Sequence, residues 1–278
     1  MTVYKHSGEL GPLGLLAPVF TALAAVLLGL VYAYIDVWSP IAGYISLLFV
    51  AGFGIGLLFA VTLVGKAVKC RNATFMTLVG LFTGVVALYA SWAFFAYALL
   101  SRYDDTFEAS MADVFLSPGA VWAMAQQINE TGWYTIKGMT PSGGVLWAFW
   151  GVEALIIVGA SVMGGVVALS GEVFCERCST WCDDSEVQPR LKLPDGEVAQ
   201  DLSTADLTTL EALQPAAADD NPHLFVSIKQ CGGCGKTAAA QLQRVRFEAG
   251  DDGDLKQESE ELGETHLLSD EERQVRWG

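Results

Sequence analysis

The sequence predicts an integral membrane protein, in which an all-α bundle of four transmembrane helices precedes a small α+β domain. Three observations predict this fold class. Four long apolar runs come first, two closely spaced cysteine pairs follow them, and the tail carries most of the net charge of −15. Hydrophobic residues make up 52% of the chain and the mean hydropathy is +0.39, values that are unusual for a soluble domain of this length.

Each apolar run is long enough to cross a lipid bilayer. A hydrocarbon core about 30 Å thick requires roughly 20 apolar residues in a helix. The predicted spans are residues 13–35, 41–64, 75–100 and 145–169, with a segment 1–12 before them and an external loop 101–144 before the last. Apolar side chains surround each run, as contact with lipid requires. Pro18 falls in the second turn of the first span, where a kink is expected.

The short loops predict the orientation. Lys66, Lys69 and Arg71 cluster between the second and third spans, whereas the other links contain few basic residues. By the positive-inside rule, this loop and both termini lie in the cytoplasm, which suggests a multi-pass protein of a bacterial inner membrane. All six cysteines then lie on the reducing side, where thiols serve as metal ligands more often than as disulfides.

The tail, residues 171–278, forms a strongly acidic domain. It contains 10 Lys or Arg against 23 Asp or Glu, a net charge of −13. Such a surface repels the phosphate backbone, so we expect no nucleic-acid partner.

Two Cys-x-x-Cys pairs lie in this domain, Cys175 with Cys178 and Cys231 with Cys234, and 52 residues separate them. Together they offer four thiolates, the ligand set of a closed structural zinc site. Hydropathy alternates over 223–229 and 239–247, which predicts strands on both sides of the second pair. Residues 223–247 therefore resemble the zinc knuckle of rubredoxin-like and zinc-ribbon domains, and the resemblance implies a zinc-ribbon-like domain.

The first pair departs from that pattern. No glycine follows Cys178, and a third cysteine, Cys182, comes soon after, so Cys182 is an alternate ligand in place of Cys175 or Cys178. Three uses of the thiols stay open: structural zinc, thiol redox chemistry, and an iron–sulfur cluster or no metal. Short helices are also predicted over 201–213 and 269–276.

Glu153 is the one ionisable residue within the predicted spans. An intramembrane carboxyl is a functional candidate by default. By depth, Tyr89 or Ser91 on the third span is its expected hydrogen-bond partner. Two roles fit Glu153: a protonated group that ties two helices together, and part of a proton or ion relay.

Small residues and one loop motif complete the membrane part. Ala160 and Gly164 share a helical stripe with Glu153 and would let another helix approach closely. Glycines of the second and third spans are expected at helix contacts, namely Gly52, Gly54, Gly56, Gly80 and Gly84. In the external loop, Ser117 and Pro118 predict a short helix over 120–128 that stops near Gly132.

The leading expectation is a non-enzymatic scaffold. The bundle would anchor the chain and form homo-oligomers, while the zinc domain docks a cytoplasmic protein partner. The sequence contains no recognisable nucleophile–base constellation or phosphate-binding loop. Two alternatives are a small transporter or channel subunit that uses Glu153 and a membrane thiol oxidoreductase.

Overall fold

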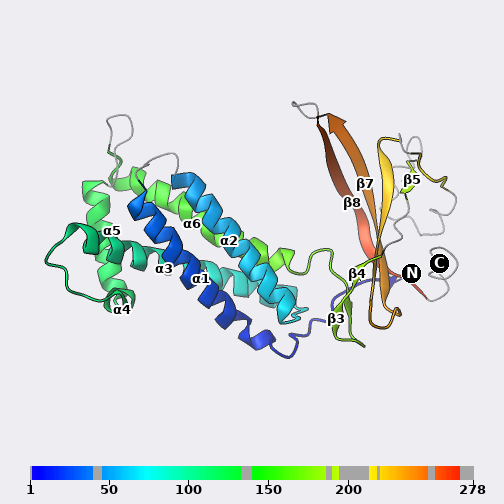
Figure 1. Ribbon diagram of the computed structural model, residues 1–278, viewed down its shortest axis with the longest axis horizontal. Coiled ribbons are helices and arrows are strands. Elements are labelled where there is room, and N and C mark those ends of the chain that lie inside the picture. The colour runs from blue at the N-terminus through cyan, green and yellow to red at the C-terminus, as the bar shows by residue number, and fades with distance from the viewer. Residues whose placement is uncertain are drawn as a thin grey trace. The chain divides into compact units, whose positions relative to one another are not determined.

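The computed structural model describes residues 2–39, 46–132, 140–185, 190–193, 213–217, 220–249 and 254–269 of the chain. The chain divides into two compact units, Gly8–Ser170 and a second that joins Met1–Ser7 to Gly171–Gly278. The first is helical and the second is built largely of strands (Figure 1). The helices predicted over 201–213 and 269–276 lie almost wholly outside the described residues.

Four long helices form the first unit: α1 (Ala17–Trp38), α2 (Ser46–Ala67), α3 (Ala73–Tyr103) and α6 (Gly143–Val167). Among the described residues, these four helices are long and apolar enough to cross a membrane, which confirms that part of the prediction. Helix α3 packs against α1 and α6, and α6 also packs against α2. Large apolar side chains such as Leu23, Leu63 and Leu155 are exposed on the outside of the bundle, where lipid would cover them.

The start of α1 differs from the prediction. A short 3-10 turn, η1 (Gly14–Leu16), precedes the helix, and Pro18 lies in the first turn of α1 rather than the second. A proline in the first turn removes no helical hydrogen bond, because that N–H would have no partner within the helix. Pro18 therefore starts the helix without interrupting it.

Close helix contacts in the bundle depend on glycine. An added Cβ at Gly84 of α3 would lie 2.8 Å from Cα of Val158, and one at Gly164 of α6 would lie 2.6 Å from the carbonyl oxygen of Leu58. Gly80 and Gly54, both predicted at contacts, also face α6, whereas a Cβ at Gly52 would meet nothing within 4 Å. Side chains would thus force α6 away from both α2 and α3.

Hydroxyl groups between the helices are satisfied internally. The Thr83 hydroxyl lies 2.7 Å from the Thr21 hydroxyl, which joins α3 to α1. The Thr62 hydroxyl donates to the carbonyl oxygen of Gly164 at 3.1 Å, which joins α2 to α6. Because a buried polar group without a partner is costly, these bonds favour one arrangement of the helices.

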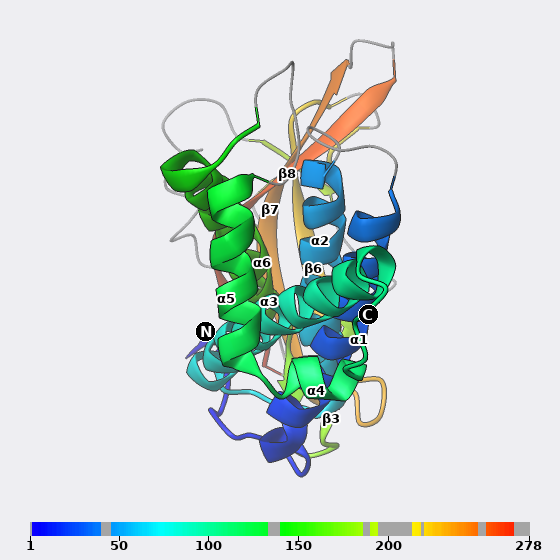
Figure 2. The same ribbon diagram turned by 90° about the vertical axis from the view of Figure 1, so that its left-hand side faces the viewer.

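Two short helices, α4 (Met111–Phe115) and α5 (Pro118–Thr131), lie at one end of the bundle (Figure 2). Helix α5 confirms the predicted helix, and its C-cap is Gly132, with φ of 83°. Ser117 is its N-cap residue by position, although its side chain makes no capping hydrogen bond. Trp122 of α5 packs against Trp147 of α6, with ring centroids 5.3 Å apart.

The second unit contains an antiparallel sheet in the order β1-β8-β7-β6-β4, with β5 also paired to β6 (Figure 1). Its strands are β1 (Thr2–Val3), β4 (Asp183–Asp184), β5 (Arg190–Lys192), β6 (His223–Gln230), β7 (Ala238–Ala249) and β8 (Leu255–Leu267). A separate hairpin pairs β2 (Phe174–Cys175) with β3 (Thr180–Trp181). The two strands predicted around the second cysteine pair are confirmed as β6 and β7, and Leu224, Val226 and Ile228 lie together in a core on one face.

The pairing of β1 with β8 was not anticipated from the sequence. Thr2 pairs with Leu267 and Val3 with His266, so the first residues of the chain belong to the same unit as its tail. A two-residue strand carries no periodic signal, and nothing in residues 1–12 indicated this partner.

The glycine contacts generate a stability prediction. Gly165→Ala places a methyl group against the carbonyl oxygen of Met76 in α3, so we expect it to lower the free energy of unfolding by about 1–3 kcal/mol. Gly159→Ala on the same helix is the matched control, because its Cβ would meet nothing within 4 Å. Thermal unfolding of both purified variants in detergent, followed by circular dichroism, measures the difference. Equal midpoints for the two variants would contradict the close packing of α3 and α6.

Candidate metal centre

Two tight turns bring the predicted cysteine ligands together. Cys175 ends β2 and Cys178 lies in the turn before β3, while Cys231 and Cys234 lie in the turn between β6 and β7. The second turn is closed by backbone hydrogen bonds from Gly235 N–H to the Cys231 carbonyl and from Cys231 N–H to the Thr237 carbonyl, both 2.8 Å. Paired strands flank each turn. The two Cys-x-x-Cys segments lie close enough together for their four sulfurs to meet.

The four ligand atoms are close enough together to bind one metal ion. The Sγ atoms of Cys175, Cys178, Cys231 and Cys234, here called the thiol cluster, all lie within 4.8 Å of one another. The Sγ atoms of Cys175 and Cys234 are 3.7 Å apart. Metal–sulfur bonds of about 2.3 Å in a tetrahedron place sulfurs about 3.8 Å apart, whereas a disulfide requires about 2.0 Å. The thiol cluster can therefore hold a metal ion, and its four cysteines are free thiols.

Hydrogen bonds to sulfur favour the thiolate form of this cluster. The backbone N–H of Lys236 donates to Sγ of Cys234 at 3.4 Å, and the Thr237 hydroxyl donates to Sγ of Cys175 at 3.1 Å. The Lys236 N–H lowers the pKa of Cys234 to about 6. Hydrogen bonding with the neighbouring sulfurs, Cys234 first, raises the pKa of Cys178 to about 12. Cys234 therefore loses its proton readily, whereas Cys178 retains its own. A bound cation would favour the charged form of both thiols.

Glycine makes room for the sulfurs in the second turn. A Cβ at Gly233 would lie 3.3 Å from Sγ of Cys178, so a side chain there would press on a ligand. Gly235 has φ of +61°, a left-handed conformation that glycine adopts without strain. Space beside a ligand sulfur thus accounts for Gly233, and backbone conformation accounts for Gly235.

Cys182 lies beside the thiol cluster and outside the group of four. It is buried in a small apolar cluster with Val173 and Ala239, and its Sγ lies 3.9 Å from the Thr237 carbonyl oxygen. Burial, followed by the nearby cysteines, raises the pKa of Cys182 to about 12, which keeps it a neutral thiol. The arrangement in which Cys182 replaces Cys175 or Cys178 is not the one in the structure. Cys70 belongs to the other unit and is also buried.

Sequence reasoning missed the N-terminal residues that support the site. The Tyr4 hydroxyl accepts a hydrogen bond from Phe174 N–H at 2.9 Å, next to Cys175. It also lies 3.1 Å from Nδ1 of His6, whose ring meets Trp181 edge-on at 6.1 Å. Residues far apart in sequence are joined here, and no local pattern signals this contact.

The hydroxyls expected beside Glu153 donate to backbone carbonyls. The Tyr89 hydroxyl donates to the Phe115 carbonyl at 2.5 Å, and the Ser91 hydroxyl donates to the Leu88 carbonyl at 2.9 Å. Each hydroxyl oxygen can still accept a hydrogen bond, so the pairing of Glu153 with Tyr89 or Ser91 stays a prediction. Glu153 is half-buried on α6 and interacts electrostatically with Asp36 of α1.

Asp36 lies in helix α1, although the sequence reasoning placed it in a loop. The first span was predicted to end at residue 35, but α1 continues to Trp38. The hydrogen bond from Arg102 to the Val37 carbonyl at 2.7 Å supports this last turn of α1. A polar residue at the end of an apolar run was the available signal, and it indicates a loop as readily as a helix end.

No protein family, no curated protein and no solved structure matches the chain. The function is therefore inferred from the geometry of the chain's own residues.

The thiol cluster predicts which cysteines retain a metal. We expect Cys231→Ser to remove at least half of the bound metal and to lower the unfolding midpoint, since three thiolates and a hydroxyl form a weaker site. Cys182→Ser is the matched control, because it is an equally buried neighbour outside the group of four, and it should retain one metal per chain. Elemental analysis of the purified chains measures both. Metal loss in Cys182→Ser with retention in Cys231→Ser would reverse the assignment.

Proposed function

We propose that the chain is a membrane-anchored docking protein whose second unit is a zinc-ribbon-like domain stapled by structural zinc. The observation that supports this most directly is the set of four thiols whose sulfurs all lie within 4.8 Å of one another. A site with four protein ligands leaves no position for substrate or water, which is typical of structural rather than catalytic zinc.

Zinc is the proposed metal for two reasons. A set of four thiolates in a tetrahedron favours zinc or iron, and zinc requires no redox partner. The sulfurs of the two turns also approach each other, since the Sγ atoms of Cys175 and Cys234 are 3.7 Å apart. A metal site shared by both turns requires such an approach, whereas thiol exchange requires only one Cys-x-x-Cys pair. The meeting of both pairs supports metal binding over the thiol oxidoreductase alternative.

Docking is proposed from the character of the second unit. It carries a sheet with long exposed strands and a strongly negative charge, on a chain whose other unit is suited to a bilayer. With the orientation predicted from Lys66, Lys69 and Arg71, this unit faces the cytoplasm of a bacterial cell. The partner would be a cytoplasmic protein, with the bundle as the anchor and as a surface for homo-oligomers.

The experiment compares four forms of the chain in the native membrane. We expect the full chain to retain a specific cytoplasmic protein after crosslinking and capture, and a chain ending at Ser170 to lose at least nine-tenths of it, because the docking unit is gone. Cys231→Ser should lose it as well if the metal orders that unit, whereas Cys70→Ser should not. Membrane levels of all forms are measured by immunoblot. Equal recovery by the full and truncated chains would reject the docking role.

A second candidate function has one specific observation in its favour. Glu153 of α6 interacts electrostatically with Asp36, and Tyr32 of α1 interacts with both carboxyl groups. An intramembrane carboxyl is a functional candidate by default, and two carboxyls from different helices can pass a proton or hold a cation. A small transporter or channel subunit using Glu153 is therefore the alternative.

Proton flux in vesicles tests this alternative. If it holds, purified protein in liposomes should dissipate a pH gradient faster than protein-free liposomes, and Glu153→Gln should slow this at least tenfold by removing the titrating group. Glu108→Gln is the control, since Glu108 is an exposed carboxyl beyond the end of α3. Flux no faster than in protein-free liposomes, or equal flux in Glu153→Gln, would reject a relay through Glu153.

A further inference from the structure

The second unit has a long open strand edge. On one side, β8 pairs with β7 from Leu255 to Leu267. On its other side, β1 covers only His266 and Leu267, and the N–H of Tyr4 reaches the carbonyl of Thr265. Within the described residues, no strand pairs with the outer edge of β8 from Leu255 to Glu264.

An open edge of this length can accept another strand. Every second residue of an edge strand directs its backbone N–H and C=O groups outward, and an extended peptide that pairs with them extends the sheet. The stretch Leu255–Leu262 pairs without interruption with β7, so it is held in regular extended form. It contains no proline, which would block such pairing.

The charge on this edge selects the kind of strand. Residues 255–264 include four glutamates and one lysine, and every glutamate among them is exposed: Glu258, Glu260, Glu261 and Glu264. Glu260 forms an ion pair with Arg244 of β7 at 3.2 Å, which neutralises one of the four. The remaining excess of negative charge attracts lysine and arginine side chains on an incoming strand.

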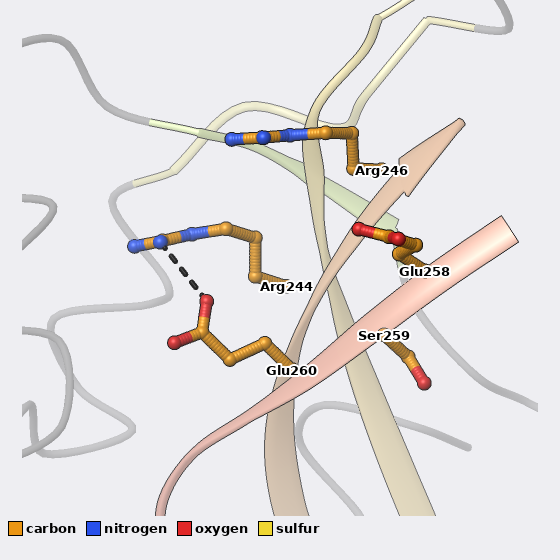
Figure 3. Close-up of a pocket in the computed structure, with 5 residues that line it drawn as sticks. All are labelled: Arg244, Arg246, Glu258, Ser259 and Glu260. Atoms are coloured by element: carbon orange, nitrogen blue, oxygen red, sulfur yellow. Dashed lines mark hydrogen bonds and ion pairs between the residues drawn. The ribbon is translucent and has the colours of Figure 1, made fainter. Parts of the chain in front are cut away.

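The face of the hairpin adds a second element of recognition. Arg244, Arg246, Glu258, Ser259 and Glu260 line a hollow of about 430 Å³ (Figure 3). In that view Arg244 and Arg246 extend to the same side of the hairpin as Glu260, and Arg246 forms its ion pair with Glu248. Because directly opposed residues on paired strands lie about 5 Å apart, a basic side chain next to β8 on this side would meet Glu258.

We propose that the outer edge of β8 binds an extended basic segment of a partner protein as an added strand of the sheet. The proposal rests on the docking function above and names the chemistry of the partner. A second copy of the chain is a poorer occupant, since two β8 edges would bring like charges together. A nucleic acid is excluded for the same reason, because its phosphates carry the wrong sign.

The test uses the full chain in detergent and synthetic peptides. The probe is a fluorescent eight-residue peptide of alternating lysine and valine, and its binding is followed by anisotropy. A matched peptide carries N-methyl groups on alternate residues, which retains the charge but removes the backbone donors of one edge. We expect the first peptide to bind and the second to bind at least tenfold more weakly. Equal binding of the two would overturn strand addition.

Variants of the chain locate the site. Glu258→Gln with Glu261→Gln should weaken binding about three- to tenfold, because two of the negative charges that attract the lysines are lost. Asp105→Asn with Glu108→Gln is the matched control, since it removes the same charge from exposed residues of the helical unit and should leave binding unchanged. Hydrogen exchange of residues 255–264 should slow when the peptide is bound. Unchanged affinity in the β8 variant, or no slowing there, would overturn the proposal.

The outcomes also separate this inference from the docking function. If the lysine–valine peptide does not bind while partner capture still depends on the residues after Ser170, the β8 edge is rejected and docking at another surface stands. If capture is independent of those residues, the docking function itself fails, whatever the peptide does.

Discussion

The second unit depends on the meeting of two turns at four sulfurs. Cys175 and Cys178 come from one hairpin, Cys231 and Cys234 from another, and the segment between them spans 52 residues. The apolar core of this unit is small and is built mainly from aliphatic side chains of β6 and β7. A small core supplies little stability, so a metal ion that links distant segments would contribute a larger share of the free energy of unfolding here than in a larger domain. The hydrogen bonds from Lys236 and Thr237 to sulfur fit that role, because they stabilise charge on the ligands.

In the helical unit, the corresponding constraint is the close approach of helices. Apolar surface alone does not hold helices together in lipid, so short contacts and buried hydroxyls must do so. Gly164 illustrates both, because it lets α2 come close and its carbonyl accepts the Thr62 hydroxyl. Ala160 and Gly164 were expected to admit a neighbouring helix, and both face α2. Glu153, which the sequence places on the same stripe, is half-buried and interacts electrostatically with Asp36.

Local signals were sufficient for the regular elements. Apolar length predicted the four long helices, and alternation predicted β6 and β7, because these patterns reflect which face of an element is buried. A first-turn proline and a glycine stop predicted α5. The cysteine pairs predicted the four thiols that lie together, because Cys-x-x-Cys in a tight turn already directs two sulfurs to one side. Metal binding by those thiols stays a prediction.

The sequence by itself determined that this chain has an apolar helical half and a charged half with two thiol pairs, since composition and periodicity are properties of each segment alone. Only the tertiary structure decided that β1 joins β8 and that Cys182 stays outside the thiol cluster. Those outcomes depend on contacts between residues 55 to 265 positions apart, and such contacts are set by packing and hydrogen-bond competition across the whole fold. The same holds for the open edge of β8, because a strand pattern predicts an element but not which of its two sides will be covered.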